Sequence, residues 1–111
     1  MSEADSLDQL RDRLREFARQ RNWERYHTPK NLTTALAGEA GELASILQWA
    51  VSDEPTEPYR PELEEEIGDV LIYLVRLCDV AEINPIDAAN AKIDRNAQRF
   101  PAGELRQALE G

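Results

Sequence analysis

The most informative stretch of this 111-residue chain is residues 65–74, Glu65-Glu66-Ile67-Gly68-Asp69-Val70-Leu71-Ile72-Tyr73-Leu74. It belongs to a segment that Pro61 opens, and the apolar residues of that segment recur at helical spacing rather than in strict alternation. The apolar stripe comprises Leu63, Ile67, Val70, Leu71, Leu74, Leu77 and Cys78. The segment therefore predicts a long helix that carries two carboxylates, Glu66 and Asp69, within its apolar part.

Three further helices are predicted around this one. Residues 6–22 place apolar side chains at helical spacing between charges, which indicates an amphipathic helix. Thr28-Pro29 pairs a capping residue with proline at the first helical position, so we expect a helix from there to Val51. Asn84-Pro85 repeats this start signal for a helix that runs to about Arg99. Residues 52–61 contain three prolines and are expected to form a loop, and residues 103–109 a short last helix.

The predicted fold class is all-α, because no window alternates apolar and polar residues in the way that strands require. The length fits one domain over residues 1–111, with a core at about 6–101, built as a four-helix bundle with short connections. A bundle of this size gains buried core by association, so we expect a homo-oligomer.

Composition excludes several classes of function. The 22 acidic and 13 basic residues give a net charge of −9, which argues against nucleic-acid and anionic-membrane partners. The longest apolar run, Val70 to Val75, is too short to span a membrane, and the acidic N-terminus predicts no signal peptide, so we expect a cytoplasmic protein. With one cysteine (Cys78) and one histidine (His27), no intrachain disulfide, cysteine cage or two-imidazole metal site is expected. A metal ion would therefore have to be bound mainly by oxygen ligands.

Two acidic motifs provide such ligands. Glu39-Ala40-Gly41-Glu42 and Glu66-Ile67-Gly68-Asp69 each place two carboxylates on one helix face. The short loop between the two helices predicts that they pack as antiparallel neighbours. Four converging carboxylates need cations, and hard oxygen ligands favour Mg²⁺ or Mn²⁺. The glycine inside each motif costs about 1 kcal/mol in a helix, which suggests close backbone approach or space for a ligand. The alternative is that each pair lies on a solvated helix face.

Aromatic and basic residues extend the same pattern. Trp49 follows Glu42 and Tyr73 follows Glu66 by seven residues, or about 10 Å along a helix, so a stacking ring could share a groove with the metal. The alternative is ordinary core packing, and antiparallel helices would place Trp49 and Tyr73 on opposite sides of the acids. Further along the chain, polar donors share one helix face, which is either a phosphate-binding or a solvated face: Lys92, Asn96 and Arg99.

These residues together resemble the MazG-like all-α nucleoside triphosphate pyrophosphohydrolases, most closely the dCTP pyrophosphatase subgroup. Besides the two acidic motifs, the resemblance includes Arg21-Asn22-Trp23-Glu24, His27-x-Pro29-Lys30-Asn31-Leu32, Leu47-Gln48-Trp49 and Lys92-x-Asp94-x-Asn96-x-x-Arg99-Phe100-Pro101. It extends from about residue 7 to residue 101, which is nearly the whole domain.

The resemblance implies cleavage of a nucleoside triphosphate to the monophosphate and pyrophosphate with Mg²⁺ (or Mn²⁺), as part of nucleotide-pool sanitation, by a tetramer built as a dimer of dimers. It assigns the metal ligands as Glu39, Glu42, Glu66 and Asp69. Glu39 or Glu65 would accept the proton of the attacking water. The implied substrate-binding residues are Trp23, His27, Lys30, Asn31, Trp49, Tyr73, Lys92, Asn96 and Arg99.

One position departs from the subgroup: Leu14 stands where the vertebrate enzymes carry a histidine in the pocket. We therefore expect hydrolysis of dCTP and related pyrimidine deoxynucleotides with looser discrimination, since an apolar contact separates substrates by only about 1–3 kcal/mol. Two alternatives stay open. One is the same fold acting on a different or broad set of nucleotides, and the other is a helical module that binds a nucleotide or Mg²⁺ without hydrolysis.

Overall fold

The computed structural model describes residues 6–102, and within this range it contains helices and no strand. The elements follow the order α1 (Leu7–Gln20), the 3-10 turn η2 (Glu24–Tyr26), α2 (Pro29–Ile46), the 3-10 turn η3 (Glu57–Tyr59), α3 (Arg60–Val80) and α4 (Pro85–Arg99). The all-α class with four main helices is thereby confirmed. The helix expected at 103–109 lies outside the described residues. None of the helices in the described range is long and apolar enough to cross a membrane.

The predicted helix starts rest on local capping hydrogen bonds. The Thr28 hydroxyl accepts the backbone N–H of Asn31 at 3.1 Å, with Pro29 in the first turn of α2. The Asn84 side chain accepts two backbone N–H groups at the start of α4, from Ile86 at 3.0 Å and Asp87 at 3.1 Å. Ser6 caps α1 in the same way. Each cap satisfies backbone donors that the helix itself leaves free.

Two predicted helix ends were wrong. α1 ends at Gln20 instead of residue 22, because Asn22 has a positive φ of 56° and turns the chain. α2 ends at Ile46 rather than Val51, and the chain continues in turns in which Gln48 N–H bonds the Ser45 carbonyl. Trp49 is 89% exposed and Val51 is also exposed, so no packed face extends the helix there. The expected loop at 52–61 also contains η3 and the first two residues of α3, Arg60 and Pro61.

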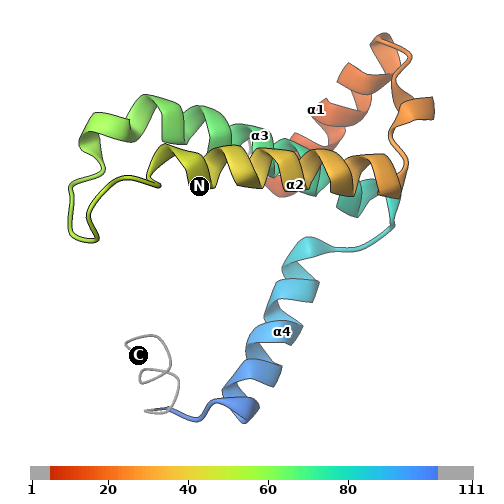
Figure 1. The fold of residues 1–111 in the computed structure, drawn as a ribbon. Helices are drawn as coiled ribbons and strands as arrows, with labels where there is room; N and C mark the ends of the chain where they lie inside the picture. The colour runs from red at the N-terminus through yellow and green to blue at the C-terminus, as the bar shows by residue number, and fades with distance from the viewer. Residues whose placement is uncertain (1–5, 103–111) are drawn as a thin grey trace.

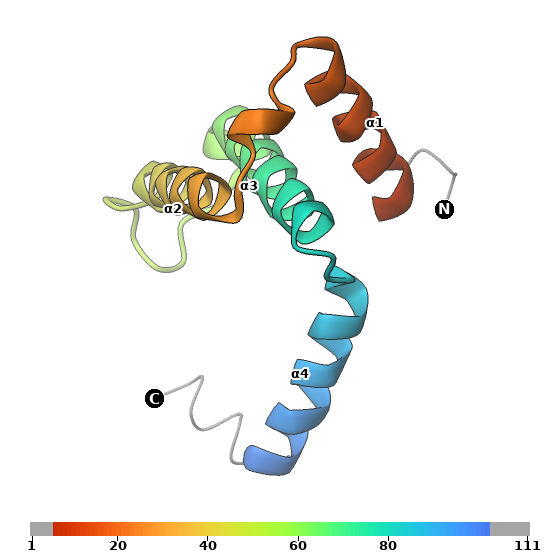
Figure 2. The same cartoon turned by 90° about the vertical axis from the view of Figure 1, so that its right-hand side faces the viewer.

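Three helices form the packed part of the chain. α2 and α3 lie side by side and run in opposite directions (Figure 1), and α1 packs across α3 (Figure 2). The fully buried apolar core of the described residues is small: Ala18, Leu32, Val75 and Cys78. Three of the seven residues in the predicted α3 stripe remain exposed: Ile67, Leu71 and Leu74. One chain therefore leaves much of its apolar surface uncovered.

The fourth helix does not complete a bundle within one chain. Figures 1 and 2 both show α4 projecting away from α1, α2 and α3. The short connection from α3 explains this direction, because Glu82 has a left-handed φ of 58° that redirects the backbone after α3 ends. Ile86 and Ile93 of α4 are more than half exposed as a result. The bundle expected from the sequence thus needs another surface to cover α4.

Candidate metal centre

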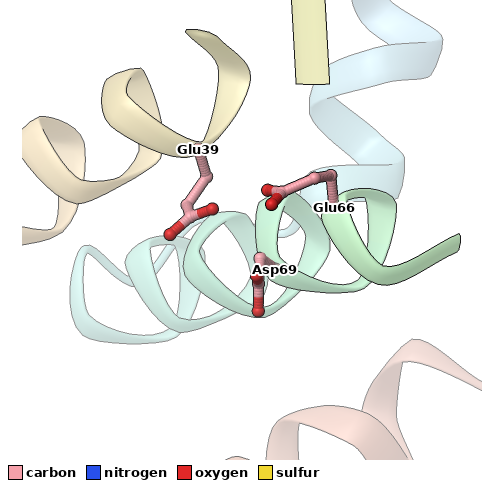
Figure 3. Close-up of side chains that lie close together, drawn as sticks. All are labelled: Glu39, Glu66 and Asp69. Atoms are coloured by element: carbon pink, nitrogen blue, oxygen red, sulfur yellow. The ribbon is translucent and has the colours of Figure 1, made fainter. Parts of the chain in front are cut away.

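The antiparallel packing of α2 and α3 brings carboxylates from both predicted motifs together. Figure 3 shows Glu39 from α2 facing Glu66 and Asp69 from α3. Each of the three contributes a carboxylate oxygen, and these oxygens lie within 4.8 Å of one another. All three side chains are half-buried. Three of the four predicted ligands therefore form one cluster, which we call the acidic cluster (Glu39, Glu66 and Asp69).

The fourth predicted ligand lies outside this cluster. Glu42 is one turn further along α2, and it is exposed. Its negative charge is still close enough to raise the pKa of Glu66. Glu65, the second candidate base, is exposed on α3, whereas Glu39, the first, belongs to the cluster.

The acidic cluster requires a proton or a cation. Oε2 of Glu66 is buried without a hydrogen-bond partner. Proton sharing with Glu39, followed by burial and the charges of Glu39, Asp69 and Glu42, raises the pKa of Glu66 to about 7. Negative groups this close cannot all ionise without compensation. Oxygen donors of this kind fit a hard divalent cation such as Mg²⁺ or Mn²⁺.

The motif glycines leave open space rather than allowing close backbone contact. A Cβ built on Gly41 or Gly68 meets no other atom within 4 Å. The expectation of close helix approach at these positions was therefore wrong for one chain. The second expectation, space at the motifs, agrees with the geometry.

The predicted aromatic residues separate into two places. The rings of Trp23 and His27 meet edge to face, with centroids 6.3 Å apart, just before α2. Trp49 lies just after the C-terminal end of α2, and the half-buried Tyr73 lies on α3, one turn after Asp69. Because α2 and α3 are antiparallel, these two rings lie on opposite sides of the acidic cluster. Asn31 lies near His27, where its side-chain N–H donates to the Tyr26 carbonyl at 2.9 Å and so stabilises the turn before α2.

The predicted cationic donors do not meet the acidic cluster within one chain. Lys30 is exposed in the first turn of α2. Lys92, Asn96 and Arg99 lie on α4, which projects away from the cluster (Figure 1). A cavity of about 690 Å³ lies away from the cluster, between the starts of α1 and α4 and the end of α3. One chain therefore brings together the acids but not the donors predicted to bind phosphate on α4.

Sequence reasoning missed a polar network beside His27. Arg76 of α3 donates from Nε to Nδ1 of His27 at 3.0 Å and from Nη1 to Asp79 at 3.3 Å. Arg15 of α1 holds the same Asp79 carboxylate. The available signal was that Arg76 is the only charged residue in the apolar run Val70–Cys78.

The fold and the acidic cluster agree with the family comparison. Residues 27–103 match the MazG nucleotide pyrophosphohydrolase domain, so the chain belongs to the MazG family. Among individual relatives, dCTP pyrophosphatase 1 from Mus musculus is 43% identical over 101 residues, which cover 86% of this chain and 59% of that protein. Its Homo sapiens counterpart is 42% identical over 102 residues, covering 87% of this chain and 60% of that protein.

The chain spans about three fifths of the length of these curated relatives. A solved structure is similar over nearly its full length. The crystal structure of a pyrophosphatase from Archaeoglobus fulgidus has a TM-score of 0.81 and 49% identity, and the match covers 86% of this chain and 92% of that one.

Proposed function

We propose that this chain is a divalent-metal-dependent hydrolase that cleaves nucleoside triphosphates to the monophosphate and pyrophosphate. The observation that carries this proposal is the acidic cluster with the unpartnered, buried Oε2 of Glu66. Membership of the MazG nucleotide pyrophosphohydrolase family supports the reaction class. The proposed substrates are dCTP and related pyrimidine deoxynucleotides, supported by the identity to proteins named dCTP pyrophosphatase 1.

Glu39, Glu66 and Asp69 would hold the metal, with Glu42 completing the set from the next turn of α2. When bound, Mg²⁺, or Mn²⁺ in its place, supplies charge neutralisation for the triphosphate and acidifies the attacking water. A carboxylate accepts the proton of that water, and Glu39 is better placed than the exposed Glu65. Water oxygen bonds to the α-phosphorus as the bond from that phosphorus to the bridging oxygen breaks, and pyrophosphate leaves.

The substrate-binding residues are proposed to come from more than one chain. Trp23 and His27 lie in the connection before α2, Asn31 on α2 and Tyr73 on α3, whereas Lys92, Asn96 and Arg99 lie on the projecting α4. The negative triphosphate needs cations in addition to the metal. We therefore propose a homo-oligomer, a tetramer arranged as a dimer of dimers, in which α4 of one copy reaches the acidic cluster of another. The exposed Ile86 and Ile93 support an association surface on α4.

Because free nucleotides are the proposed substrates, we propose that the enzyme acts in the cytoplasm, in nucleotide-pool sanitation. The deciding experiment is a panel of common and modified nucleoside triphosphates with Mg²⁺, read out as pyrophosphate release. Release from dCTP above the other nucleotides supports the full proposal. Release from purine nucleotides alone contradicts the pyrimidine assignment, and binding without release from any nucleotide contradicts hydrolysis.

A further inference from the structure

Arg76 is a charged residue in an unusual environment. It lies in the apolar run Val70–Cys78 of α3, and only 8% of its surface is exposed. Burying a guanidinium is costly unless its donors find partners. Arg76 has two such partners: Nδ1 of His27, 3.0 Å from its Nε, and Oδ2 of Asp79, 3.3 Å from its Nη1. The contact with Asp79 balances the positive charge of Arg76, and the contact with His27 connects Arg76 to the turn before α2.

The contact with Arg76 determines how His27 carries its proton. A guanidinium can donate hydrogen bonds but cannot accept them, so Nδ1 of His27 must be the unprotonated, accepting nitrogen. The neutral ring then carries its proton on Nε2. Burial, followed by the positive charge of Arg76, lowers the pKa of His27, which keeps the ring neutral near pH 7. His27 is thus a hydrogen-bond donor on its remaining nitrogen.

Arg76, the partner of His27, lies on the same helix as two members of the acidic cluster. Arg76 follows Asp69 by seven residues, which is two helical turns, or about 10 Å along the same face of α3. Tyr73 lies between these two levels. An extended nucleotide with its triphosphate beside the acids therefore brings its base to the level of His27 and Trp23, whose rings are in edge-to-face contact.

We propose that Arg76 is a positioning residue that holds His27 as the Nε2–H tautomer, so that His27 donates a hydrogen bond to a carbonyl oxygen of the bound pyrimidine base. The inference deepens the proposed function and rests on it for the identity of the ligand. It predicts that the base is read through an acceptor atom at this position and that an amino group placed there is disfavoured.

The first test uses the wild-type protein and needs no variant. His27 is the only histidine in the chain, so ¹⁵N-histidine labelling gives the signals of a single ring. Long-range ¹⁵N–¹H correlation at a pH where the ring is neutral should show one form, with Nδ1 unprotonated and Nε2 protonated. A mixture of tautomers, or the Nδ1–H form, would overturn the proposal.

The second test compares two variants that remove different cations from Asp79. Arg76→Met keeps an apolar stem and frees Nδ1 of His27, whereas Arg15→Met breaks the other ion pair and leaves the Arg76–His27 contact intact. With dCTP and Mg²⁺, we expect Arg76→Met to shift His27 to mixed tautomers and to raise KM about three- to tenfold, with kcat within about twofold. Arg15→Met should change neither the tautomer nor KM.

Equal KM effects in the two variants would indicate a purely structural role for Arg76 and overturn the proposal, as would a wild-type KM in Arg76→Met. If Arg76→Met does not fold, the wild-type spectrum decides the tautomer. A wild-type protein with the Nε2–H form but no pyrophosphate release would contradict the proposed function instead, so the two failures are distinguishable.

Discussion

Arg15 of α1 and Asp79 of α3 form a two-pronged ion pair, with Nε to Oδ2 at 2.7 Å and Nη2 to Oδ1 at 2.5 Å. The two residues are 64 positions apart in the chain, and the pair ties α1 to the end of α3. Asp79 is also the charge partner of the buried Arg76. This one carboxylate therefore connects the docking of α1 with the group that orients His27.

The Arg15–Asp79 pair predicts a loss of stability in acid. The hydrogen bond from Arg15 lowers the pKa of Asp79 below its ordinary value of 3.8, so the unfolded state binds more protons than the native state near that pH. The stabilisation of the folded state by this ion pair is present above about pH 4. It is lost as the pH falls through the pKa of Asp79 in the native state. We expect Asp79→Asn to lower Tm at pH 7 and the two curves to approach each other as the pH falls below 3.8. Glu16→Gln, in a pair within α1, is the control and should have a smaller effect. Curves that stay parallel below pH 3.8 would contradict this.

Removal of a cluster carboxylate should abolish turnover without unfolding the protein. Asp69→Asn replaces one of the three converging carboxylates with a neutral amide, and we expect pyrophosphate release to fall by at least about 100-fold. Helical circular dichroism should be unchanged, and stability without metal should not decrease, because repulsion within the cluster is relieved. Glu62→Gln, exposed in the first turn of α3, is the matched control. Full activity in Asp69→Asn would disprove the metal assignment.

Metal should stabilise the protein more as the pH rises. In metal-free protein the native pKa of Glu66 is about 7, above the ordinary 4.5, so the native state holds the extra proton between these values. Stability therefore falls as the pH rises from about 4.5 to 7, and a bound cation offsets that loss. Thermal melts with EDTA and with Mg²⁺ should differ more at pH 8 than at pH 5.5. Glu66→Gln should remove most of this pH dependence. An increase in Tm by Mg²⁺ that is equal at both pH values would contradict the coupling between metal binding and the protonation of Glu66.

Mixing two inactive variants should restore activity if α4 acts on another copy. Asp69→Asn lacks a cluster carboxylate, and Lys92→Met lacks a cation of α4. In a randomly exchanged dimer unit, about a quarter of all sites combine intact residues from both chains, so about a quarter of wild-type activity should return. The double variant Asp69→Asn/Lys92→Met mixed with itself is the control. No recovery after verified subunit exchange would mean that α4 acts within its own chain.

Trp49 should contribute to substrate binding and not to folding of the single chain. Its side chain is 89% exposed, so Trp49→Ala should leave helical content and the metal-free Tm of the subunit nearly unchanged. Stacking on a base contributes about 1–3 kcal/mol, so KM for dCTP should rise about 5- to 150-fold with a smaller change in kcat. Val51→Ala, also exposed after α2, is the control. A fall in kcat at constant KM would assign Trp49 to the catalytic scaffold instead.

The order of residues is enough to predict the helix starts and the acidic motifs. The Thr28 and Asn84 caps form with backbone groups two or three residues away, so their effect is local and readable from the order of residues. The same holds for Glu66 and Asp69, because a spacing of three residues in a helix fixes a shared face.

The tertiary structure decided which of these groups meet. Glu39 reaches Glu66 and Asp69 while Glu42 stays exposed, because the register of α2 against α3 depends on packing along both helices. The end of α2 and the direction of α4 depend on whether the apolar side chains there are buried by other parts of the protein. In one chain, Trp49 and Ile93 remain exposed. Arg76 meets His27 across 49 residues of chain, and no local rule specifies such a contact. The helix starts depend on hydrogen bonds between residues close in the sequence. The site depends on the packing of side chains that are far apart in the sequence.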